Sequence, residues 1–180
     1  LPPATYLPLI LFGILLGILA WFYQYCLINI HCWYGKIHWL PRNRRSIIPL
    51  LLVIPIGLWD AKMLGGSHVF VEVIAQLPHH VHGFKTIMFL LLAYFVIRFA
   101  FSMISYGAAV PGGIFMPILV LGAILGSLAG IVMIKLGIIP ATAYINIVVI
   151  GMAAYFGAIE MAPFTAICLL TEMVGTIQQI

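Results

Sequence analysis

Charged residues are scarce in this sequence, and their scarcity excludes most classes of soluble protein. Only 7% of the 180 residues are Asp, Glu, Lys or Arg, whereas 64% are hydrophobic and the mean hydropathy is +1.21. A soluble domain has roughly 25% charged residues. The composition therefore predicts an integral membrane protein.

Acidic residues, paired cysteines and catalytic motifs are also missing or few. The chain has four acids, Asp60, Glu72, Glu160 and Glu172, and three cysteines, Cys26, Cys32 and Cys168. The cysteines show no CxxC spacing, so we interpret them as small buried hydrophobic residues rather than disulfide partners or metal ligands. No nucleophile lies in a recognisable motif with a base, and there is no Walker loop or HExxH pattern. We therefore do not expect an enzyme.

Basic residues are unevenly distributed. Half of the eight lie in one short stretch, as Lys36, Arg42, Arg44 and Arg45. Positive charge in a short loop between apolar segments marks the cytoplasmic side of a membrane. We expect the loop 31–45 to be cytoplasmic, in a protein of the plasma (inner) membrane. Because half of the basic residues lie in this one loop, the positive charge does not indicate nucleic-acid binding.

Apolar segments of unequal length predict an all-α, polytopic fold. Leu7–Asn29, Phe84–Ser105 and Ile114–Ile134 reach the roughly 20 residues that a helix needs to cross a hydrocarbon core. Shorter apolar segments are predicted at 47–59, 69–77, 144–159 and 162–174, with Pro49 and Pro55 interrupting the first. Segments broken by Pro or Gly are typical of transporters and channels. The abrupt beginning and end of the sequence favour a piece of a longer protein.

Glycines at four-residue spacing predict close helix packing at two places. One set is Gly13 and Gly17, and the other is Gly122, Gly126 and Gly130. Small residues four apart form a helix face that lets another backbone approach closely.

An uncharged break separates two apolar segments. After Pro111, Gly112 and Gly113 a new helix is predicted to begin near Ile114, with Pro117 in its first turn. The first N–H groups of a helix have no partner within it and carry the positive end of the helix dipole. This arrangement suits an anion held inside a membrane without a charged side chain. The alternative is a loop that joins two helices outside the bilayer.

Two charged residues lie within predicted helices. Arg98 could attract anions toward a pore, or it could make a structural contact with a carbonyl or a carboxylate. Glu172, near the end of the last helix, could relay protons or serve a structural role.

A histidine cluster supplies a second class of function. His79, His80 and His82 follow Glu72 in the sequence and could bind a metal, which would suit a membrane-embedded metalloenzyme. The alternative for this cluster is a solvated loop. A third possibility for the whole chain is a structural membrane subunit that does not transport.

Two motifs lie in a fixed order along the second half of the chain. Residues 106–117 read YGAAVPGGIFMP, and residues 151–156, 162–167 and 170–173 read GMAAYF, APFTAI and LTEM. Together they resemble the filter region and the later signature of the ClC family of chloride channels and proton–chloride antiporters. Arg98 stands fifteen residues before Gly113, where the family often has an arginine. One departure is Glu160-Met161, where many members have an apolar residue followed by arginine.

The resemblance implies a fold and a function. ClC proteins are homodimers with one anion pathway per subunit, built from two halves of inverted topology with broken and re-entrant helices. Residues 1–180 would form part of a single ClC transmembrane domain, similar to helices J to P, without the N-terminal half and the last helices. The implied function is selective transport of chloride or a similar anion, by a channel or by exchange for protons.

The resemblance also implies an anion site made by backbone amides. In the family, the amides that match Ile114 and Phe115 coordinate the central anion, and the amide that matches Met116 helps to form an outer site. Gly113 would belong to the same set, with possible support from Arg98, Pro111, Gly112, Pro117 and Glu172. Bound chloride is expected and no cofactor. The family's serine loop, gating glutamate and pore tyrosine have no match in this sequence.

Overall fold

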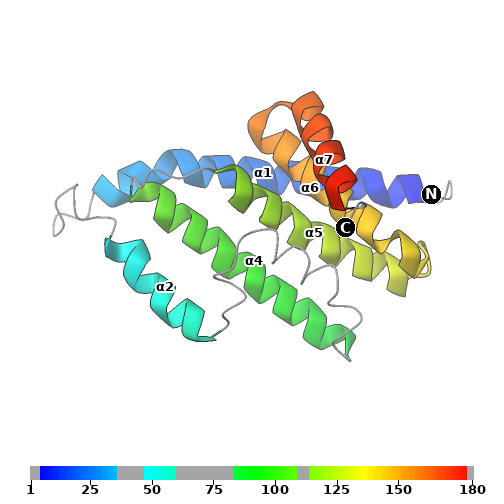
Figure 1. Cartoon of the computed structure of the whole chain (residues 1–180), viewed down its shortest axis with the longest axis horizontal. Coiled ribbons are helices and arrows are strands. Elements are labelled where there is room, and N and C mark those ends of the chain that lie inside the picture. The colour runs from blue at the N-terminus through cyan, green and yellow to red at the C-terminus, as the bar shows by residue number, and fades with distance from the viewer. Residues whose placement is uncertain (1–4, 36–46, 60–82, 109–113, 178–180) are drawn as a thin grey trace.

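The computed structural model describes residues 5–35, 47–59, 83–108 and 114–177 (Figure 1). Every longer regular element in these ranges is an α-helix, which confirms the all-α, polytopic prediction. The elements are α1 (Tyr6–Gly35), α2 (Ile47–Trp59), α4 (Phe84–Gly107), α5 (Phe115–Lys135), the short 3-10 helix η4 (Ala141–Ala143), α6 (Tyr144–Glu160) and α7 (Pro163–Ile177).

Four helices are long and apolar enough to cross a membrane. Their candidate spans are Tyr6–Ile30, Phe84–Gly107, Phe115–Lys135 and Ala141–Glu160. The last three agree with the predicted segments, whereas α1 continues beyond the predicted end at Asn29 to Gly35. The chain is an integral membrane protein.

Prolines and glycines define several helix ends. Pro163 begins α7 and Pro117 lies in the first turn of α5, where a missing N–H costs nothing. Gly137 follows the end of α5 with φ +70°, and Ile138 N donates to Met133 O at 3.0 Å, which closes a Schellman motif. Prolines were predicted to interrupt the segment 47–59, but α2 continues through Pro55. Apolar helices tolerate proline when neighbouring groups compensate for the lost bond.

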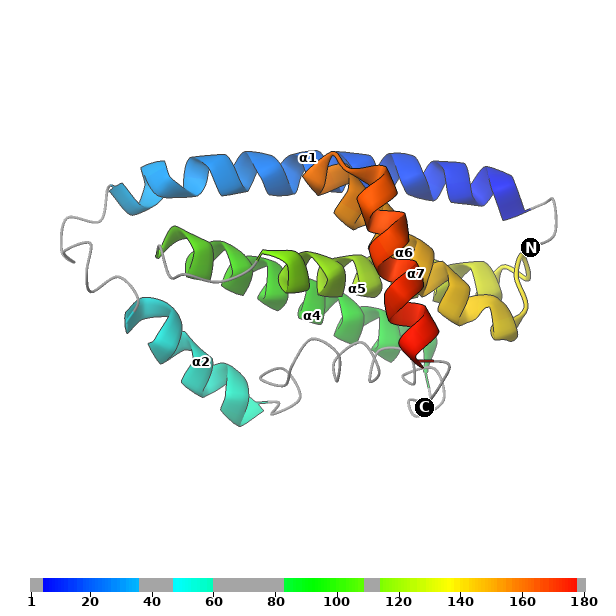
Figure 2. The same cartoon turned by 45° about the horizontal axis from the view of Figure 1, so that its top comes forward.

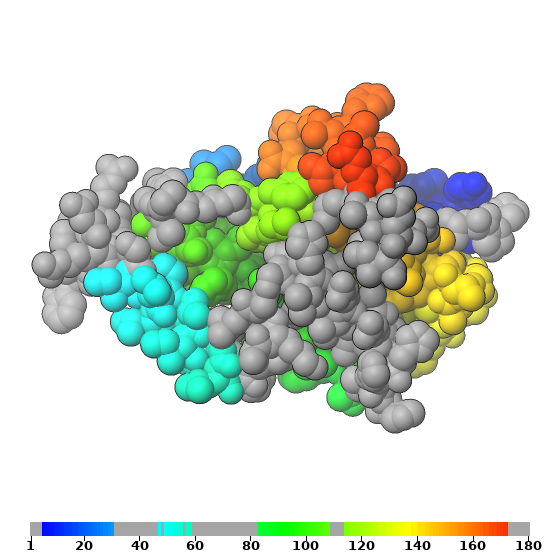
Figure 3. Space-filling model, viewed as in Figure 1, coloured from blue at the N-terminus to red at the C-terminus, as the bar shows by residue number. Residues whose placement is uncertain are grey.

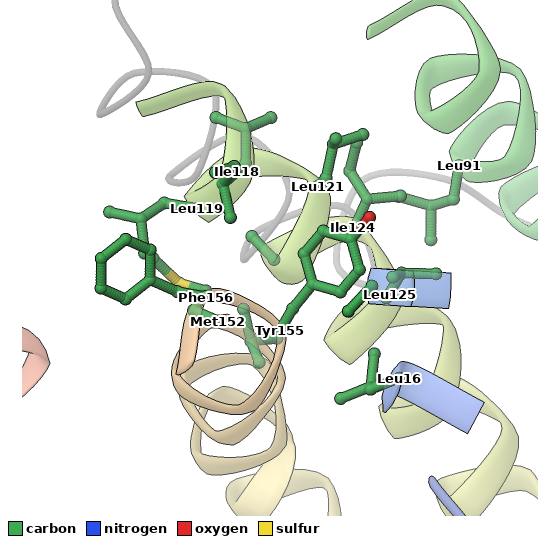
Figure 4. Packing of buried hydrophobic residues seen from close by; sticks show 14 of the residues in the cluster. Leu16, Leu91, Ile118, Leu119, Leu121, Ile124, Leu125, Met152, Tyr155 and Phe156 are labelled. Atoms are coloured by element: carbon green, nitrogen blue, oxygen red, sulfur yellow. The ribbon is translucent and has the colours of Figure 1, made fainter. Parts of the chain in front are cut away.

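The helices pack around α5. Figures 1 and 2 show α1 along the whole length of the molecule, α4 and α5 antiparallel to each other beside it, and α6 returning along α5. The core lies where these four helices meet: Leu16, Leu91, Ile124 and Tyr155 are fully buried there (Figure 4). The outer faces of α1 and α4 remain apolar and exposed, as expected of helices that face lipid.

Candidate functional site

The first turn of α5 is the structural element on which the predicted anion site depends. Ile114 occupies the N-cap position, and no side chain caps the helix there. The first turn carries no acidic residue, and the N–H of Ile118 donates to the carbonyl of Ile114 at 3.2 Å. The N–H groups of Phe115 and Met116 precede that bond and have no acceptor within the helix. Pro117 contributes no N–H.

Burial around this turn changes over a few residues. Ile114, Phe115 and Pro117 are half-buried, Met116 is 36% exposed and Ile118 is fully buried. The positive end of the helix dipole therefore lies at a boundary between the protein core and its surface.

Backbone contact with α6 fixes the position of α5. A Cβ atom on Gly126 would lie 2.8 Å from the Cα atom of Val148, and one on Gly151 would lie 2.6 Å from the Cα atom of Gly126. Real Cβ atoms do not approach so closely, so only glycine allows this crossing. The close packing predicted for Gly122, Gly126 and Gly130 is confirmed. By contrast, a Cβ on Gly13 or Gly17 would meet nothing within 4 Å, so the described residues do not use that face of α1.

An aromatic pair joins the start of α5 to the end of α6. The rings of Phe115 and Phe156 have centroids 5.0 Å apart and planes at 88°, an edge-to-face arrangement. Phe156 is 6% exposed and lies beside Leu119 of α5 (Figure 4). Phe156 belongs to the motif at 151–156, but its contact with Phe115 was not predicted from the sequence. Its spacing of four from Met152, on the face that meets the glycines of α5, is the signal that could have identified it.

Polar contacts in the core hold α1 against the other helices. The hydroxyl groups of Tyr23 and Ser102 are hydrogen-bonded at 2.8 Å, and Nε2 of Gln24 donates to the carbonyl of Ile159. These bonds connect α1 with α4 and with the end of α6, and the sequence reading did not predict them.

The remaining predicted site residues are placed as follows. Arg98 is half-buried on α4, nine residues before the helix ends, which is about 14 Å along its axis. Glu172 is exposed on α7. Pro111, Gly112 and Gly113 lie outside the described residues.

The predicted metal cluster also lies outside them, since His79, His80, His82 and Glu72 fall in the range 60–82. Among the described residues, no group of three His, Cys, Asp or Glu side chains is placed to hold a metal ion.

Comparison with known proteins decides the family. The model of the family described as "Voltage gated chloride channel" matches residues 1–180, the whole chain. The chain belongs to the voltage-gated chloride channel family. This finding confirms the resemblance that the motifs at 106–117 and 151–173 predicted.

Two relatives are named as exchange transporters. A Klebsiella pneumoniae protein named H(+)/Cl(-) exchange transporter ClcA is 31% identical over 125 residues, which cover 69% of this chain and 25% of the relative. The Vibrio cholerae protein of the same name is 28% identical over 171 residues, covering 91% of this chain and 34% of the relative. The chain thus spans a quarter to a third of these relatives. No solved structure matches it at a comparable level of significance.

Proposed function

We propose that the complete protein selectively transports chloride or similar anions across a membrane, and that backbone amides at the start of α5 form part of the anion site. The observation that carries the proposal is the uncapped, uncharged first turn of α5 in a chain of the voltage-gated chloride channel family. Proton-coupled exchange is the mechanism that the relatives' names favour. The chain would then be a transporter and not an enzyme.

The chemistry of the turn supports anion binding. An anion that leaves water needs donors to replace its hydration shell. The N–H groups of Ile114, Phe115 and Met116 are donors of this kind, and the helix dipole adds a positive potential. Gly113 would let the ion approach the backbone, since it has no side chain. Because these donors are neutral, an ion could bind and still leave.

Other parts of the proposal follow from the family. The complete protein would be a homodimer in the plasma (inner) membrane, with lipid around its apolar helices and the loop 31–45 in the cytoplasm. Residues 1–180 would be part of one transmembrane domain, and Arg98 and Glu172 would support the anion or proton route. Bound chloride is the ligand that we expect, without a cofactor.

The direct test is a structure of the full-length protein soaked in bromide. We expect ordered bromide within hydrogen-bonding distance of the N–H groups of Ile114 and Phe115. Failure to find a halide there, in protein that transports chloride, would reject the amide site while leaving the transport function standing.

Flux measurements in liposomes test the same site by mutation. Gly113→Val should abolish chloride flux, because the added side chain blocks the approach to the amides. Phe115→Ala should alter selectivity and retain binding, since the backbone N–H remains. Phe89→Ala is the control, because Phe89 is 74% exposed on the outer face of α4. Equal effects of the three substitutions would contradict the proposal.

A further inference from the structure

Contacts between α5 and α6 form a regular ladder with four-residue steps. A Cβ on Gly130 would lie 2.9 Å from the ring of Tyr144, one on Gly126 2.8 Å from Val148, and one on Gly122 2.8 Å from Met152. Each step along α5 toward its start is matched by a step along α6 toward its end. The two helices are therefore in register over three consecutive turns.

The next step of the ladder reaches the start of α5. Four residues after Met152 comes Phe156, and its ring packs edge-to-face against the ring of Phe115. Phe156 thus contacts the residue whose amide belongs to the proposed anion site. The four-residue steps would pair Phe156 with Ile118, and its ring extends to Phe115, three residues earlier in the first turn of α5.

We propose that Phe156 is a positioning residue, which sets anion selectivity by holding Phe115 and its N–H in place. The inference rests on the proposed anion site and extends it to a residue of another helix that does not touch the ion. The side chain of Phe156 has no polar atom and is 6% exposed, so it would act on the anion site through its contact with the ring of Phe115.

The packing explains how this contact can affect anion selectivity. The glycine crossing prevents α6 from approaching α5 further, because backbone already meets backbone there. A well-packed interior does not deform continuously, so a change in one ring moves its neighbour or leaves a void. The strength of a hydrogen bond falls steeply with poor distance and angle. A small movement of Phe115 would therefore change the relative binding of anions that differ in size and shape.

A double-mutant cycle on selectivity tests the inference in the full-length protein. Chloride and nitrate fluxes into liposomes are measured for wild type, Phe156→Leu, Phe115→Leu and the double variant. We expect each single substitution to change the flux ratio by about three- to tenfold, and the double variant to change it no more than the larger single effect, because residues in contact are coupled.

Phe12→Leu is the matched control, since Phe12 is 7% exposed and lies on α1. It should lower the melting temperature as Phe156→Leu does and leave the flux ratio within about twofold of wild type. A merely structural role for Phe156 would give the same result as this control. Phe156→Met, whose flexible side chain adapts to the space that the ring leaves, replaces the leucine variant if that variant does not fold.

Two outcomes would overturn this inference and leave the proposed function standing. One is an unchanged flux ratio in Phe156→Leu or Phe156→Met, in protein that transports chloride. The other is a double variant whose effect is the product of the single effects. Wild-type protein that moves neither anion would overturn the proposed function, and this inference with it.

Discussion

The carbonyl of Ile159 shows how one residue can depend on a distant part of the chain. In a continuous helix it would accept a hydrogen bond from the N–H of residue 163, but that residue is proline and has none. Gln24 of α1 donates its side-chain amide to this carbonyl instead. The turn between α6 and α7 is therefore stabilised from α1.

We predict that Gln24→Leu destabilises the protein by about 1–2 kcal/mol, because a partly buried carbonyl loses its donor in an apolar environment. Unfolding of the purified protein by heat or denaturant measures the effect. Asn29→Ala is the control, since the Asn29 amide donates at an exposed position to the carbonyl of Tyr25, 2.9 Å away. It should change stability little. Equal stability of the two variants would mean that water replaces Gln24.

At the scale of the elements, the crossing of α5 and α6 is the tightest feature of the fold. A methyl group on Gly126 would collide with the Cα atom of Val148, and one on Gly151 would collide with the Cα atom of Gly126, so neither residue leaves room for it. Without a hydrophobic driving force between helices in lipid, this close packing supplies much of the attraction.

We predict that Gly126→Ala lowers stability by about 1–3 kcal/mol, as overpacking of a dense core does. Gly17→Ala is the matched control in α1, where a Cβ would meet nothing within 4 Å. It should be neutral or stabilising by about 0.5–1 kcal/mol, because alanine favours the helix over glycine. Thermal unfolding of both variants measures these changes in stability. Tolerance of Gly126→Ala would show that the helices can move apart.

The same elements show what the sequence could predict. The spacing of Gly122, Gly126 and Gly130 predicted a close helix contact, and Pro117 with the preceding glycines placed the start of α5 to within one residue. Both rest on local chemistry. The partner of the glycine face, α6, and the pairing of Phe115 with Phe156 depend on how two helices align, which local patterns do not encode. Gly13 and Gly17 have the same spacing and meet no described neighbour.

At the scale of the whole molecule, apolar side chains cover surfaces that a soluble protein would not expose. Figure 3 shows the end of α6 and α7 standing out from the body of the molecule. Met161, Phe164 and Ile167 are exposed in this region, and Phe164 is 84% exposed. Lipid or further protein in the complete assembly would cover such a surface.

The orientation in the membrane is a further prediction at this scale. The end of α5 lies near the start of α4, where Lys135 Nζ is 3.7 Å from the centroid of the Phe84 ring. This is the end of the molecule at which α1 begins, and α1 ends at the opposite side (Figures 1 and 2). In a cysteine-free background, Asn43→Cys should resist a membrane-impermeant thiol reagent in intact cells, and Lys85→Cys should react. The reverse pattern would invert the topology.

The last prediction is that residues 1–180 do not conduct anions by themselves. At the proposed site the start of α5 would approach an ion from one side only, and an ion stripped of water needs partners on several sides to offset the cost of desolvation. The stretch from Ile114 to Pro117 has no hydroxyl group that could complete the shell. The relatives named as exchange transporters are three to four times as long as the matched region, since the match covers 25% and 34% of them. We therefore expect liposomes that contain only this segment to show no selective chloride efflux, and liposomes that contain the full-length protein to show it. Robust, chloride-selective efflux from the segment would place the pathway within these helices and away from the start of α5.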